Sequence, residues 1–260
     1  MGGRGSRSGG LGAGGGLGGI GGGAGGALFG TPAAATPPQV TPGQPVPAIT
    51  VQQLQSMNDQ EFAAYMNGLR STPIDPLTYY NNNWDTQRLV ANMPELNKAP
   101  QVVDTATFNS LPGDVIYRTV NAKGSDTAVD ICGRTMMSDV TTIGEGRMGD
   151  GFYFHSRLSS SQGFYGNTSN NIQKTATMSA KLNANARVVS ESQLQNMLSR
   201  EAPSVRNAVR GMSSGGQWSG SSGYIAYALY KGYNVVSDGT IYNIIDRSAA
   251  TWSSNIIPKS

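Results

Sequence analysis

The segment MGDGFYFHS, residues 148–156, concentrates residue types that can bind a ligand or take part in a reaction. Two glycines, Gly149 and Gly151, precede a run of aromatic residues that ends at His155, the only histidine in the chain. A glycine-led aromatic strand can offer a ring on which a planar heterocycle stacks, and main-chain groups that no Cβ obstructs. The segment therefore indicates either a binding strand or a site built around the histidine.

The single histidine and the single cysteine limit the chemistry of any site. A Ser/His/Asp triad would need His155 as its base, but a strand side chain faces the core about as often as solvent, and we expect His155 to be structural. Because Cys132 is the only cysteine, an internal disulfide is excluded, and so is a Cys/His zinc site. We expect no metal site, since any metal would need oxygen ligands alone.

The glycine-rich segment GEGRMGDG, residues 144–151, is similar to a phosphate-binding loop. It precedes a predicted strand rather than a helix, and it lacks a lysine followed by serine or threonine. We therefore do not expect a Walker-type nucleotide site. Two acids, Glu145 and Asp150, flank this loop, and we expect them to be solvated turn residues rather than a catalytic pair.

The first 49 residues differ in composition from the rest of the chain. Residues 1–30 contain 17 of the 35 glycines, and residues 31–49 contain six prolines. Glycine adds little apolar surface and loses much backbone entropy on ordering, so the first segment predicts a flexible tail rather than a membrane span. The prolines predict an extended linker. The net charge of +3 includes no run of Lys or Arg, so we expect no nucleic-acid site.

Residues 50–97 predict a helical N-terminal subdomain. Thr50 and Gln53 have the spacing of a capping box. In the following segment, apolar residues recur at helical spacing at Phe62, Tyr65, Met66 and Leu69. A second helix is predicted over residues 85–93.

Residues 98–260 predict a sheet with few helices. After Gly113 the apolar period changes to two, and the pattern predicts strands over 114–120, 151–156, 175–182, 185–189, 233–237 and 240–246. Helices are predicted over 191–201 and 221–232. In 175–182 apolar and polar residues alternate, which predicts one buried face and one solvent-exposed face. Helices followed by strands favour an α+β fold with a mixed or antiparallel sheet.

Four segments in this order resemble the ADP-ribosyltransferase fold, which bacterial toxins, poly-ADP-ribose polymerases and domains of phage virion proteins share. IYRTV is similar to the arginine strand of these enzymes, and a strand arginine can clamp a diphosphate with its planar fork. GDGFYFHSRLSSSQGFY is similar to the glycine and aromatic block of the polymerases. AKLNANARVV is similar to the strand after it, and YALYKGYNVVSDGTIYNIIDRSA to the closing helix and strands. The resemblance covers about residues 98–252 and implies a split sheet.

The resemblance implies that NAD is the substrate and that its binding residues are Arg118, Thr119, Gly151, Tyr153, Ser161, Phe164 and Tyr165. In the family, the equivalent of Arg118 holds the phosphate or ribose of NAD. Gly151 and Tyr153 would form the nicotinamide pocket, Ser161 would bind the carboxamide, and the later aromatic pair would close the opposite face.

One expected residue is missing. Active members place a glutamate near the start of the last strand, where it orients the ribose and stabilises the oxocarbenium-like transition state. The matching position here is Thr240 or Ile241, and neither can carry charge. Asp238 lies two or three residues away, which along a strand is too far unless a bulge intervenes. Either Asp238 joins Arg118 and Tyr153 as a catalytic residue, or transfer is weak or lost.

Two functions follow from the resemblance. The first is an NAD-binding transferase, carried in a phage virion into the host cytoplasm, that attaches ADP-ribose to a host macromolecule. The second is a virion protein that keeps the fold without catalysis and is held to the capsid or portal by its glycine- and proline-rich tail.

Overall fold

A computed structural model describes the chain over residues 45–72, 84–122, 125–137, 148–149, 151–166, 174–212 and 221–258. The chain divides into two units, residues 1–33 and 34–260, and all the described residues belong to the second. The predicted tail and most of the predicted linker lie outside the described residues, as do Glu145 and Asp150.

The helices of this unit begin and end near their predicted bounds where capping signals are present. Thr50 and Gln53 form the expected capping box, and Ser190 and Gln193 form another. Gly232 has a φ of +86° just after the last long helix. The helical elements are α1 (Val51–Ser56), α2 (Asp59–Ser71), α3 (Trp84–Asn92), η1 (Pro94–Asn97), α4 (Thr105–Ser110), α5 (Ala128–Met136), α6 (Leu158–Gly166), α7 (Glu191–Arg200), α8 (Pro203–Gly211), α9 (Ser221–Tyr230) and η4 (Arg247–Ala249).

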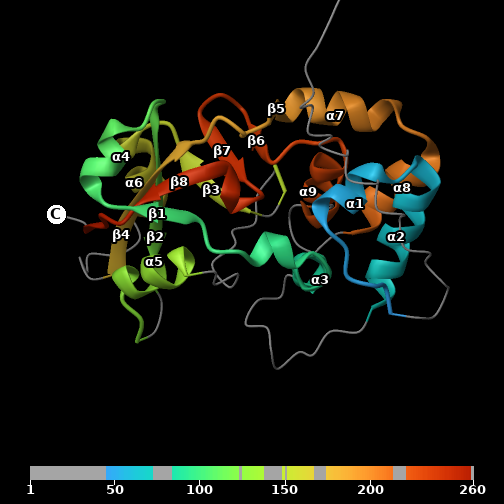
Figure 1. The fold of residues 1–260 in the computed structure, drawn as a ribbon, viewed down its shortest axis with the longest axis horizontal. Helices are drawn as coiled ribbons and strands as arrows, with labels where there is room; N and C mark the ends of the chain where they lie inside the picture. Colours follow the sequence, from blue (N-terminus) through green and yellow to red (C-terminus); the bar gives the residue numbers. More distant parts are fainter. Residues whose placement is uncertain are drawn as a thin grey trace, which may run out of the picture. The chain divides into compact units, whose positions relative to one another are not determined.

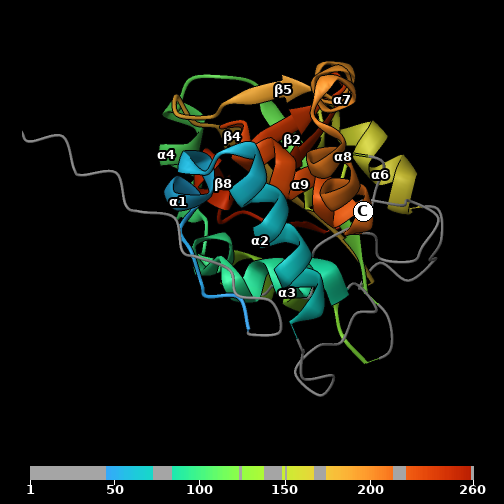
Figure 2. The same ribbon diagram turned by 90° about the vertical axis from the view of Figure 1, so that its right-hand side faces the viewer.

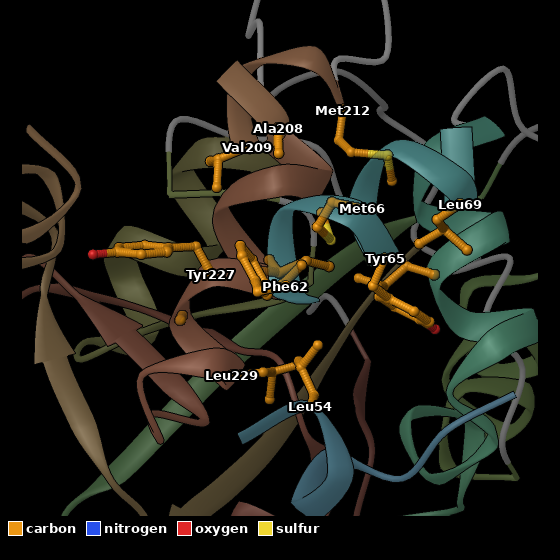
Figure 3. Close-up of a cluster of buried hydrophobic side chains, with 14 of the residues drawn as sticks. Leu54, Phe62, Tyr65, Met66, Leu69, Ala208, Val209, Met212, Tyr227 and Leu229 are labelled. Atoms are coloured by element: carbon orange, nitrogen blue, oxygen red, sulfur yellow. The ribbon is translucent and has the colours of Figure 1, made fainter. Parts of the chain in front are cut away.

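The N-terminal helices share one hydrophobic core with helices from the C-terminal half. α2 packs against α8, which packs against α9, and α1 also contacts α9 (Figure 1 and Figure 2). Leu54, Phe62, Met66 and Val209 are among the fully buried side chains where these helices meet (Figure 3). Residues 50–97 are therefore packed into the same core as α8 and α9. Among the described helices, none is long and apolar enough to cross a membrane.

The strands form one mixed sheet, so the fold is α+β as the sequence predicts. In the described residues their order is β1-β8-β4-β2-β3-β7-β6-β5, and β9 adds to β4. The β1–β8 and β5–β6 pairs are parallel, and the other pairs are antiparallel. The strands are β1 (Gln101–Val103), β2 (Val115–Asn121), β3 (Phe152–His155), β4 (Thr175–Leu182), β5 (Val188–Ser190), β6 (Val235–Ser237), β7 (Ile241–Ile244), β8 (Ala250–Ser253) and β9 (Ile257–Pro258).

The expectation that one face of residues 175–182 is exposed is wrong. In β4 the polar residues Thr177, Ser179 and Lys181 are 1%, 6% and 7% exposed. α6 covers this polar face, and the ammonium of Lys181 donates to the Leu111 carbonyl at 2.6 Å. α5 packs on the opposite face, where Cys132 joins the second core cluster. Both faces of β4 are covered, and hydrogen bonds inside the fold satisfy Thr177 and Lys181 on the polar face.

Candidate functional site

The sheet opens between β2 and β3, close to the residues that the sequence motifs single out. These strands are paired at one position, Tyr117 opposite His155, whereas β2 pairs with β4 along its whole length. Beyond that position, the Thr119 main-chain N–H donates to the Ser161 hydroxyl on α6 at 2.8 Å. The Ser161 hydroxyl therefore accepts the main-chain hydrogen bond that β3 would otherwise accept from Thr119.

The hydroxyl of Ser161 belongs to a buried chain of three hydroxyl groups. It lies 2.9 Å from the Thr119 hydroxyl, which in turn lies 2.8 Å from that of Thr177 on β4. Ser161 is fully buried. The structure therefore places Ser161 in the contact between α6 and the sheet, where it positions Thr119, rather than at an accessible surface.

Arg118 lies at the same opening and is 6% exposed. Its Nη1 donates to the Tyr153 carbonyl at 3.3 Å, and its guanidinium carbon lies 5.6 Å from the centre of the Phe152 ring. The guanidinium thus holds the main chain of β3 where β3 leaves β2. This contact joins the two strands at the position where their main-chain pairing ends.

The side chains of Arg118 and Tyr153 lie on opposite faces of the sheet. Because Tyr117 and His155 are paired, they share one face with Tyr153, and the alternation of the strands puts Arg118 on the other face with Phe152. Arg118 therefore contacts Tyr153 at its main-chain carbonyl, and the guanidinium does not lie beside the Tyr153 ring.

Asn243 is a site residue that the sequence analysis missed. It is fully buried on β7, directly opposite Tyr153 on β3. Its side-chain amide donates to the carbonyls of Met148 and Gly149 at 3.0 and 3.2 Å. The Tyr153 hydroxyl donates to the Gly149 carbonyl and accepts from the Met148 main-chain N–H. Two facing side chains thus hold the turn that leads into β3. The signal in the sequence was an asparagine inside a predicted strand, where this residue type is depleted.

Residue 151 is a glycine because the Asn243 side chain leaves no room for a Cβ, and not because a ligand needs space there. A Cβ at residue 151 would overlap the Oδ1 of Asn243. We expect Gly151→Ala to lower the free energy of unfolding by about 1–3 kcal/mol, measured by chemical denaturation. In an Asn243→Ala background the same substitution should cost less, because the overlap is gone. Equal costs in both backgrounds would contradict this explanation.

Phe164 and His155 form the contact between α6 and β3. Their ring centres are 5.8 Å apart with a tilt of 42°, and Phe164 is 66% exposed. The side chain of Tyr165 lies outside the described residues. Burial lowers the pKa of His155, the nearby Arg118 lowers it further, and the carboxylate of Asp238 acts in the opposite direction.

Asp238 is an exposed residue in the turn between β6 and β7. Its Oδ1 accepts hydrogen bonds from the Thr240 main-chain N–H and hydroxyl, both at 2.8 Å, and from the Ile241 main-chain N–H at 2.7 Å. Gly239, with a φ of +92°, completes this turn. Asp238 therefore closes the hairpin and places a negative charge just before the start of β7.

Ile241 is, with Thr240, one of the two positions at which the resemblance implies a catalytic acid. It pairs with His155, and the adjacent Thr240 carbonyl accepts from the Ser156 main-chain N–H at 2.8 Å. In the described residues, no group of three or more His, Cys, Asp or Glu side chains could hold a metal ion. In comparisons with family models, curated proteins and solved structures, no match to this chain reaches significance.

Proposed function

We propose that the chain is an ADP-ribosyltransferase-like protein that binds NAD and transfers ADP-ribose to a macromolecule. One observation carries the proposal. Two of the sequence motifs meet at one opening in the sheet: Arg118 of the first donates to the Tyr153 carbonyl of the second, and Ser161 of the second accepts from the Thr119 main-chain N–H of the first.

Two kinds of group near this opening would each favour one part of a dinucleotide, and they lie on opposite faces of the sheet. The guanidinium of Arg118 supplies a positive charge that cannot be lost at physiological pH, and such a charge favours a diphosphate. On the face opposite to Arg118, the Tyr153 ring is partly exposed, and the Phe164 ring extends from α6 into solvent. Aromatic surfaces of this kind favour a planar base.

A second candidate is a protein that keeps this fold without catalysis and acts as a structural component of a virion. The observation that favours it is that Thr240 and Ile241, the two positions at which the resemblance implies an acid, are both uncharged. Under either proposal, the protein is a phage virion component that residues 1–49 hold to the capsid or portal. Under the first proposal, it also enters the host cytoplasm.

The binding proposal predicts that Arg118→Lys weakens NAD binding by about 10- to 100-fold, because lysine keeps the charge and loses the planar fork. Isothermal titration calorimetry of the full chain, below the melting temperature of each variant, measures this change. Arg134→Lys is the matched control, since Arg134 is an exposed arginine paired with Asp126 at 2.9 Å. It should bind NAD as the wild type does.

Transfer is tested separately, by incubating the protein with labelled NAD and a host-cell lysate. Labelling of a macromolecule that is lost in Arg118→Lys supports the enzyme, whereas NAD binding without labelling supports the structural protein. If the wild-type chain shows no heat of binding with NAD, the binding proposal is wrong.

A further inference from the structure

His155 lies beside the place that an acid would occupy in an active enzyme. It is paired with Ile241 across β3 and β7, so the two side chains are neighbours on one face of the sheet. Tyr153 shares this face, two residues earlier on the same strand. His155 is 8% exposed, and the Phe164 ring, which forms part of its cover, is largely exposed. The imidazole is therefore covered in part by a side chain that is itself largely exposed to solvent.

The groups around the imidazole come from four elements. β2 contributes the paired residue Tyr117 and the charge of Arg118, and α6 contributes the Phe164 ring. The turn before β7 contributes the carboxylate of Asp238, and β7 itself contributes Ile241. Asp238 is held in place by three hydrogen bonds from its own turn. Among the described residues, Asp238 is the acidic residue whose charge raises the pKa of His155.

Burial and Arg118 set the protonation state of His155. Together they outweigh Asp238, so the pKa lies below its usual value of about 6.5. Near pH 7 the imidazole is therefore neutral, and it has a nitrogen lone pair that can accept a proton. A neutral imidazole can accept a proton, and the charge of the Asp238 carboxylate would favour the imidazolium that forms.

We propose that His155 is the proton acceptor of the transfer reaction, with Asp238 as the positioning residue that stabilises the resulting imidazolium. This inference rests on the proposed NAD site. The pair would replace the glutamate that is missing at Ile241: the imidazole would accept the proton, and the carboxylate would supply the negative charge.

In the proposed step, one bond to C1′ of the ribose forms and another breaks. The oxygen of the attacking hydroxyl, from water or from the acceptor molecule, forms a bond to C1′ of the nicotinamide ribose. The bond from C1′ to the nicotinamide nitrogen breaks, and its electron pair neutralises the pyridinium as nicotinamide leaves. The proton of the attacking hydroxyl passes to His155, and later to solvent. No oxidant or reductant is needed.

The test measures nicotinamide release from NAD by the full chain between pH 5 and pH 8. For the wild type we expect a rate that rises with pH and reaches its plateau by about pH 7, because only neutral His155 accepts the proton. His155→Asn should slow release by about 100-fold and remove the rise, since asparagine does not titrate. NAD affinity, measured by calorimetry, should change by less than about threefold, because a general base acts on the reaction rate rather than on binding.

Two further variants separate this role from a structural one. Asp238→Asn keeps the oxygen that accepts the turn hydrogen bonds, and it should move the rise to lower pH, because the charge that raises the His155 pKa is lost. Ile241→Glu added to His155→Asn should recover part of the lost rate, because it puts an acid opposite residue 155.

The outcomes distinguish the two proposals. NAD binding without nicotinamide release would overturn the role of His155 and leave the binding proposal intact. A rate of nicotinamide release that still rises with pH in His155→Asn would also overturn the role of His155 and leave the binding proposal intact. Absence of NAD binding by the wild type would overturn both.

Discussion

Replacing Phe62 with alanine should lower the free energy of unfolding by about 3–5 kcal/mol, the usual cost of removing a buried phenylalanine. Phe62 is fully buried on α2, and its ring stacks on Tyr230 of α9 at a centroid distance of 4.2 Å. The Tyr230 hydroxyl donates to Asp59, also on α2, at 2.8 Å. The substitution would thus leave a cavity and remove the stacking that joins two helices distant in sequence.

Phe164→Ala is the matched control for this prediction. It removes the same side chain from a position that is 66% exposed, so the free energy of unfolding should change by no more than about 0.5 kcal/mol. Urea denaturation followed by circular dichroism measures both values. Similar costs for the two variants would contradict the packing of α2 on α9.

The second large effect is expected at Gly223, in the first turn of α9. Its main-chain N–H donates to the Met212 carbonyl at 3.2 Å, and a Cβ would overlap the Val209 carbonyl of α8. Because the obstacle is main chain, it cannot turn aside as a side chain could. We expect Gly223→Ala to push α8 and α9 apart and to lower the free energy of unfolding by about 3 kcal/mol.

Gly133 provides the control, because it lies inside α5 and a Cβ added there would meet no atom within 4 Å. Gly133→Ala should raise the free energy of unfolding by up to about 1 kcal/mol, since alanine is the better helix former. Opposite signs for the same substitution in two helices would identify the close contact of α8 and α9 as the cause. The melting temperatures of the two variants would therefore shift in opposite directions.

The sequence analysis predicted some of the elements that carry local signals and missed α4, α5 and α8, although each of these helices begins at a capping residue or a proline. Residues 191–201 were expected to be helical, and α7 begins after Ser190 and ends at Arg200. The strand over 114–120 matches β2 within one residue at each end. α6 was missed because its segment is rich in serine and glycine, which are poor helix formers. Its helical state depends on packing against β2 and β4.

Long-range pairing was beyond the reach of a local pattern. β1 has three residues, and its partner β8 follows about 150 residues later, so no spacing in the sequence predicts their pairing. The buried polar face of β4 could not be predicted either. Alternating Thr, Ser and Lys residues have the pattern of an exposed face. The partners of Thr177 and Lys181, which are the Thr119 hydroxyl and the Leu111 carbonyl, come from distant parts of the chain.

The sequence motifs propose which residues form the candidate site, and the structure shows how those residues are arranged. Arg118 and Tyr153 do meet, but through a main-chain carbonyl, with their side chains on opposite faces. His155 was expected to be incidental, and its position opposite Ile241 became visible only from the register of β3 and β7. A sequence pattern gives the alternation within one strand, whereas the register between strands depends on the whole sheet.

The position of β8 has a consequence for synthesis of the protein. This strand is translated after the other long strands, yet it lies between β1 and β4 and brings Trp252 against Phe152 and Phe154. A nascent chain that ends before residue 250 would leave β1 without its partner and the second core cluster without its largest side chain. We therefore expect the sheet to stay open on the ribosome and to close only after residues 250–253 have left the exit tunnel.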